Sequence, residues 1–223
     1  KRVVTGILSL FFVMCTAVLL DIPAEAATEI TTSETWSGVA KTESVTIKGG
    51  NDPNNPVVIT VNGTTKMEHN MTVSGCVKFV GTDNERLNTS GASVSITCDP
   101  ASNVQLTIEN LIFNGSGGIT DVCIKSEPDE GYTHSISLNN ATVQGYKSTD
   151  TGSICISGNS SLTMNNSIVK TANIGVNVGD SASFTMIGGS ITNGSGASST
   201  SNSYAYLFKK WWEETFPKSK LTY

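Results

Sequence analysis

Apolar and polar residues alternate in the same way four times along residues 104–191. In each copy an apolar residue is followed by Thr or Ser and then by a second apolar residue, which is the period of a strand with one buried face. The expected inward pairs are Leu106/Ile108, Ile136/Leu138, Leu162/Met164 and Phe184/Met186. The residues between them, which we expect to point outward, are Thr107, Ser137, Thr163 and Thr185. The pattern therefore predicts four equivalent strands.

The two residues after each of these strands break the alternation. The second of them is Asn110, Asn140 or Asn166 in three copies and Gly188 in the fourth. Asn and Gly tolerate left-handed backbone angles, so we predict a turn at this position. A short second strand then ends on an apolar residue in each copy, namely Phe113, Val143, Val169 and Ile191.

A third alternating pair recurs between the copies, as Val94/Ile96, Val122/Ile124, Ile154/Ile156 and Val176/Val178. The whole pattern begins again after 30, 26 and 22 residues, counted from Leu106. Repeats of this length indicate a stacked array. Three short parallel strands per repeat, without helices between them, predict an all-β, single-domain parallel β-helix of about six coils, in which like residues stack about 4.8 Å apart.

The pattern resembles that of the right-handed parallel β-helix, or pectate-lyase-like, proteins. Their coils carry apolar stacks inside and an Asn ladder at one turn, a role that the resemblance gives to Asn110, Asn140 and Asn166. The resemblance covers residues 45–191 and is firmest from residue 94 onward. It implies no single activity, because this fold carries lyases, hydrolases, adhesins and phage tailspikes. An antiparallel sandwich is the alternative, although hairpins would not require Asn at one phase of the repeat.

The two ends of the chain differ from the repeats. Residues 1–26 have a basic start, an apolar run over 7–20 and small residues at Ala24 and Ala26, as in a cleaved signal peptide. The run is shorter than the roughly 20 residues of a membrane span, so we expect no integral membrane segment after cleavage. We assign residues 27–92 to a lead-in with degenerate coils and 93–192 to regular coils. Residues 193–203 are a Gly/Ser-rich linker.

Residues 204–223 include an aromatic amphipathic segment. Tyr204, Leu207, Phe208, Trp211 and Trp212 fall at helical spacing. A helix over residues 204–215 would suit a cap on the last coil, or a contact with a membrane surface or a partner. The third interpretation is that the segment is out-of-frame sequence at the end of a fragment.

Composition and cysteine usage narrow the range of partners. The chain has 223 residues, of which 15% are charged, and a net charge of −5, which gives little attraction to nucleic acid. Four cysteines follow the signal segment, an even number that is compatible with disulfides in an exported protein. Cys123 and Cys155 take the same outward position in the predicted third strand, so we expect them to be neighbours, either bonded or as free thiols. The remaining cysteines are Cys76 and Cys98.

Catalytic motifs of the family are not evident. Resemblance to pectate lyases would imply calcium-binding Asp residues with an Arg base, and resemblance to polygalacturonases would imply several Asp with a His. Arg86 instead stands alone in a degenerate coil, and the Asp residues are scattered. We therefore expect no catalytic residue, no metal and no cofactor, and favour a protein that is not an enzyme.

Two loops carry the candidate ligand-binding residues. Aromatic rings beside carboxylates suit stacking and hydrogen bonding to sugars, and loops often carry such functions. The candidates are Glu127, Asp129, Tyr132, His134, Tyr146 and Asp150. The alternative is that these are solvated loops with both tyrosines against the coil and His134 exposed.

The preferred hypothesis is a secreted or cell-surface β-helix module, non-catalytic, that acts in adhesion or in contact with an extracellular polysaccharide or a host or cell-wall glycan through its outer faces. A polysaccharide lyase or glycoside hydrolase relative, active or degenerate, is the second hypothesis. A structural stalk segment of a larger surface protein is the third.

Overall fold

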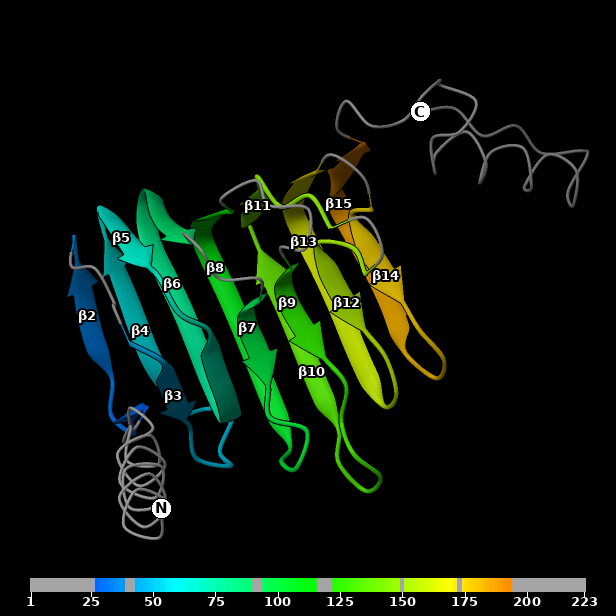
Figure 1. The fold of residues 1–223 in the computed structure, drawn as a ribbon, viewed down its shortest axis with the longest axis horizontal. Coiled ribbons are helices and arrows are strands. Elements are labelled where there is room, and N and C mark those ends of the chain that lie inside the picture. The colour runs from blue at the N-terminus through cyan, green and yellow to red at the C-terminus, as the bar shows by residue number, and fades with distance from the viewer. Residues whose placement is uncertain are drawn as a thin grey trace, which may run out of the picture.

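The computed structural model describes residues 27–38, 43–89, 94–115, 122–148, 151–171 and 174–193. The predicted signal peptide, the linker after Asn193 and the predicted C-terminal helix lie outside these residues, as does Asp150. The described ranges contain strands and no helix, and all strands join one sheet whose pairings are parallel. This confirms the predicted parallel β-helix, and the strands follow one another from the N-terminal to the C-terminal end of the stack (Figure 1).

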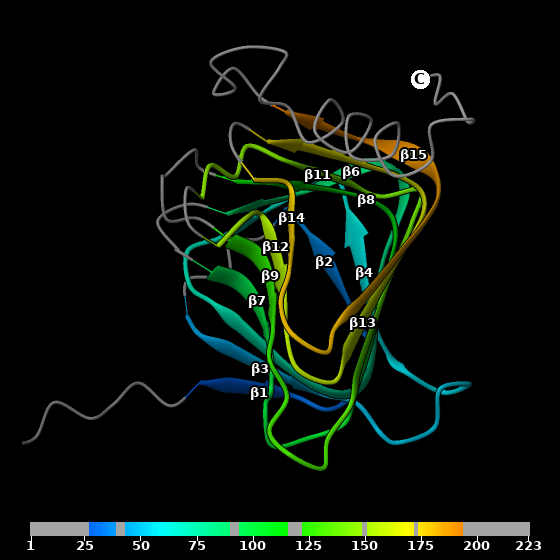
Figure 2. The ribbon, with the colours of Figure 1, turned by 90° about the vertical axis from the view of Figure 1, so that its right-hand side faces the viewer.

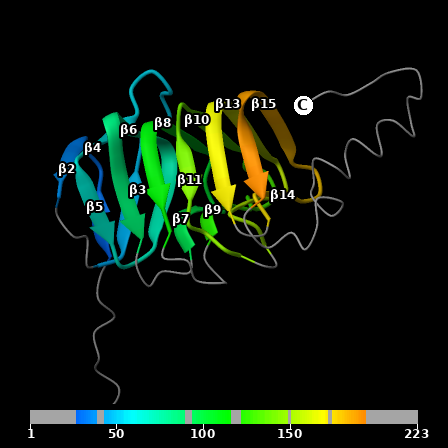
Figure 3. The same ribbon diagram turned by 90° about the horizontal axis from the view of Figure 1, so that it is seen from above.

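Seen along its axis, the chain winds around three sides in a right-handed sense (Figure 2). One side, the short-strand wall, stacks β1 (Thr28–Ile30), β3 (Val45–Lys48), the start of β6 (Met71–Thr89), β7 (Val94–Cys98), β9 (Val122–Ser126), β12 (Ile154–Ile156) and β14 (Val176–Val178). The other two sides stack β2 (Glu34–Ser37), β4 (Val57–Asn62), β5 (Thr64–Met67), the rest of β6, β8 (Val104–Asn114), β10 (His134–Asn139), β11 (Thr142–Gln144), β13 (Ser160–Thr171) and β15 (Ser183–Asn193). The number of stacked coils is close to the six predicted, and their strands lie side by side in Figure 3.

The Asn turns separate the second side from the third. Asn110, Asn140 and Asn166 have φ of 53°, 49° and 49°, and Gly188 has φ of 73°. The left-handed conformation predicted at this phase of the repeat is therefore confirmed in all four copies. It lets β8, β13 and β15 each run through two sides as one bent strand, because the pairing resumes directly after the turn.

Like residues stack inside, as the repeat predicts. Leu106 pairs with Ile136, which pairs with Leu162, and all three are at most 1% exposed. Nearer the N-terminal end, Trp36, Phe79 and Phe113 form an edge-to-face series with ring centroids 6.0 and 6.2 Å apart. Burial of this continuous stack is the main source of stability in such a fold.

The predicted register of the third strand is confirmed between β7 and β9 and between β12 and β14, but it is wrong by two residues between β9 and β12. Ile124, rather than Val122, pairs with Ile154. A shift of two residues leaves every inward side chain inward, so alternation alone does not detect it. As a result Cys155 pairs with Lys125, while Cys123 is buried, and both thiols are free. The predicted contact between Cys123 and Cys155 is therefore corrected.

Candidate functional site

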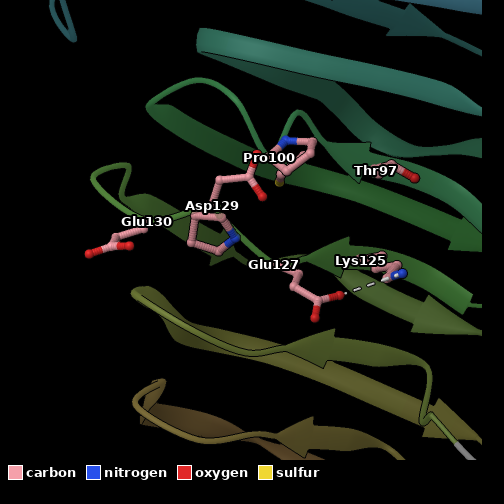
Figure 4. A pocket seen from close by; sticks show the side chains of 8 residues that line it. Thr97, Pro100, Lys125, Glu127, Asp129 and Glu130 are labelled. Carbon is pink, nitrogen blue, oxygen red and sulfur yellow. Dashed lines mark ion pairs between the residues drawn. The ribbon is translucent and has the colours of Figure 1, made fainter.

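A groove of about 500 Å³ lies where β7 and β9 pass into their loops. Its lining comes from two successive coils and consists of Thr97, Cys98, Pro100, Lys125, Glu127, Pro128, Asp129 and Glu130 (Figure 4). Two residues expected to bind ligand from the sequence, Glu127 and Asp129, are thus brought together. Lys125 was missed, although its position in β9 makes it point outward next to the loop.

The groove is mainly acidic. Lys125 Nζ lies 3.7 Å from Glu127 Oε2, and both side chains are largely exposed, so this ion pair contributes little to stability. Asp129 and Glu130 add two further carboxylates. Within the described residues, no group of three or more His, Cys, Asp or Glu side chains is arranged to hold a metal ion. The lining therefore offers many hydrogen-bond acceptors and one cationic donor.

Hydrogen bonds between coils fix the loop over residues 127–133. Asp129 donates its backbone N–H to Pro100 O at 2.9 Å, and Thr133 donates its backbone N–H to Asn103 Oδ1 at 2.9 Å. Within the loop, Tyr132 N–H donates to Asp129 O at 3.1 Å. Tyr132 itself is 37% exposed. Its ring is thus partly open to solvent, on a loop that is held in place before any ligand arrives.

His134 lies at the start of β10 and is only 2% exposed. It is therefore neither open to a ligand nor the exposed loop residue of the alternative interpretation. Its Nε2 lies 3.1 Å from both Asp99 O and Ser102 O, and since carbonyl oxygens only accept, Nε2 carries the proton. Nδ1 then accepts from Ser126 Oγ at 2.9 Å, and Ser160 Oγ lies 2.9 Å from Ser126 Oγ. Burial lowers the pKa of His134, which favours this neutral form.

The residues hydrogen-bonded to His134 position the loop beside the groove, and they do not line the groove themselves. The ring ties the loop over residues 99–102 to β9, β10 and β13. A sequence signal for its burial was present, because His134, Ile136 and Leu138 occupy alternate positions of one strand and all three are buried.

Tyr146 is also a core residue, fully buried, and so cannot contact a ligand as proposed from the sequence. Its hydroxyl lies 2.9 Å from Ser95 Oγ and accepts a hydrogen bond from Thr89 Oγ1 at 3.3 Å. Gly115 makes room for the ring, because a Cβ there would lie 2.9 Å from ring atoms of Tyr146. Burial raises the pKa of Tyr146 well above its usual value. Nothing in the alternation marks Tyr146 as inward, since it follows a strand rather than lying in one.

Amide side chains do stack between coils, one turn away from the predicted Asn ladder. Asn114 donates from Nδ2 to Asn88 Oδ1 at 3.2 Å and accepts at Oδ1 from Gln144 Nε2 at 3.3 Å. These residues end the second strand of successive coils and are in register. The predicted Asn positions are thus confirmed as turns, and these hydrogen-bonded amides lie at the following corner.

The architecture defines the class of this protein as a parallel β-helix. No family model, no curated protein and no solved structure matches the chain. Among the residues that the structure describes, no helix is long and apolar enough to cross a membrane.

Proposed function

We propose that this protein is an exported, surface-associated binding module that holds an extracellular polysaccharide in the groove at the ends of β7 and β9, without cleaving it. The observation that supports this proposal most is the groove itself, which carries donors and acceptors from two successive coils. Its loop is fixed by hydrogen bonds to the preceding coil, which reduces the entropy lost when a ligand binds.

The lining chemistry favours a particular class of glycan. Carboxylates of Glu127, Asp129 and Glu130 accept hydrogen bonds from sugar hydroxyls, and Lys125 donates to hydroxyl or ring oxygens. The partly exposed Tyr132 ring supplies an apolar face for a sugar ring. Three carboxylates against one ammonium repel a polyuronate, so the ligand is a neutral or amino-sugar polymer.

The position of His134 gives no support to a mechanism with a histidine base. His134 is the histidine closest in sequence to the groove-lining residues, and both of its ring nitrogens are engaged in buried hydrogen bonds. A base must reach the proton that it removes, directly or through one water. His134 does not line the groove, so it does not meet this requirement.

The test is retention of the purified protein on a panel of neutral, amino-sugar and uronate polysaccharides, with an assay for released products. We expect retention on a neutral or amino-sugar polymer, weakened at least tenfold by the Glu127→Gln/Asp129→Asn double variant and by Tyr132→Ala. Glu29→Gln is the matched control, because it removes an exposed carboxylate on the first coil. Equal retention of the double variant and the control would refute the groove as the site.

Two other outcomes select the alternatives. Release of shortened products would favour a lyase or hydrolase. Absence of retention on every polymer would favour a structural stalk. The feature that favours this alternative is a ladder of exposed or half-exposed hydroxyl residues on one outer face. That ladder consists of Thr107, Ser137, Thr163 and Thr185 in register.

A further inference from the structure

The last coil that the structure describes has apolar core positions that are partly exposed. The last coil contributes five inward apolar residues, the terminal rung, which are Val176, Val178, Phe184, Met186 and Ile191. In the described ranges β14 pairs only with β12, and β15 pairs only with β13. The terminal rung thus has a buried neighbour on one side and no described neighbour on the other.

The exposure of the terminal rung contrasts with that of the coil before it. Met186 is 46% exposed, whereas Met164, with which it pairs, is fully buried. Val178 is 41% exposed, whereas its partner Ile156 is fully buried. In the first described coil, by contrast, Trp36 is only 1% exposed. An open apolar end with free strand edges promotes association.

We propose that residues 204–215 of the same chain cover the terminal rung as an amphipathic helix. The segment lies outside the described residues, and its helical periodicity comes from the sequence. β15 ends at Asn193, so ten residues separate it from residue 204. Ten residues reach roughly 33 Å when extended, which allows the segment to return to the end of the coil.

The size and chemistry of the segment fit the opening. A helix of twelve residues is about 18 Å long, more than the roughly 10 Å between packed sheets. Its predicted apolar face includes Leu207, Phe208, Trp211 and Trp212, which would meet the apolar terminal rung. Its charged residues balance, with Lys209 and Lys210 four positions before Glu213 and Glu214. They fall on the opposite side of the predicted helix and would remain in water.

A tethered segment has an advantage over a second copy of the chain. A short flexible linker gives an effective concentration in the millimolar range, above that of a second molecule at ordinary concentrations. We therefore expect the full chain to be monomeric with its terminal rung covered in cis. This inference does not depend on the proposed glycan function, since the groove lies on β7 and β9.

The first test measures tryptophan exposure in the full chain by acrylamide quenching. Trp36 is buried, so the quenchable emission reports Trp211 and Trp212. We expect Met186→Glu to increase the quenching constant at least twofold and to shift the emission to the red. Thr185→Glu is the matched control, because it introduces the same charge on the outward side of the same strand. Equal quenching of the wild type and Met186→Glu would overturn the inference.

The second test changes the helix and leaves the coil intact. We expect Phe208→Glu to bind more of an apolar dye and to self-associate with rising concentration in light scattering, with its circular dichroism spectrum retained. Lys209→Glu, on the charged side of the predicted helix, should neither bind more dye than the wild type nor self-associate. If instead the wild type is a dimer and Met186→Glu makes it monomeric, a second copy covers the end and the proposal fails. Dye binding unchanged by Phe208→Glu would also contradict it.

Discussion

Replacing Tyr146 with Phe removes one hydroxyl from the interior and leaves the ring in place. That hydroxyl pairs with Ser95 and Thr89, which are 1% and 4% exposed. A buried polar group that loses its partner costs about 1–3 kcal/mol, so we expect a loss of about 2 kcal/mol in the free energy of unfolding. For a chain of this size the melting temperature should fall by roughly 4–8 °C.

The assay is urea unfolding followed by circular dichroism, together with calorimetry, and the control is Tyr132→Phe. Tyr132 is 37% exposed, so this control should change stability by less than about 0.5 kcal/mol. Tyr146→Phe should keep the wild-type retention on polysaccharide while it is folded. Equal stability of the two variants would refute the assigned role of the buried hydroxyl. Loss of retention in a stable Tyr146→Phe protein would instead make Tyr146 a binding residue.

Ionisation provides an independent check on the same residue. Burial raises the pKa of Tyr146, so the folded protein keeps the phenolic proton where the unfolded chain releases it, above about pH 10. Unfolding therefore becomes more favourable as the pH rises past 10. The difference in stability between the wild type and Tyr146→Phe should shrink over this range. A difference that stays constant up to pH 11 would contradict burial of the hydroxyl.

Three further predictions concern acid stability, the Asn turns and the thiols. Burial lowers the pKa of His134, so the stability of the folded protein should fall as the pH drops below about 6.5. This fall should be smaller in His134→Gln, measured as urea midpoints between pH 5 and 7.5. Parallel curves for the wild type and the variant would contradict this prediction. Asn140 has a left-handed φ of 49°, so Asn140→Ala should lower the free energy of unfolding by about 1–2 kcal/mol and Asn140→Gly by less. Equal losses in the two variants would argue against backbone conformation as the cause. Burial raises the pKa of Cys98 and Cys123 to about 12, so iodoacetamide at pH 8 should modify the only partly buried Cys155 faster than either of these two thiols in the native protein. A Cys123–Cys155 disulfide in unreduced peptides would contradict the register between β9 and β12.

The sequence by itself determined the stacking direction, the inward faces and the turns of the main coils. Alternation encodes which side chains point inward, and Asn110, Asn140 and Asn166 mark backbone angles that few other residues tolerate. Both are local properties that recur at one phase of the repeat. A parallel stack is the arrangement in which the equivalent positions of successive copies become neighbours.

Only the tertiary structure decided the register of the third strand, the depth of the candidate residues and the shape of the groove. A two-residue shift preserves alternation, so the partner of Cys155 depended on the lengths of the loops between coils. His134 and Tyr146 resemble binding residues in a loop, but side chains from other coils, including Ser160 and Ser95, surround them. Burial depends on neighbours that are far apart in the chain, and a local pattern contains no record of them.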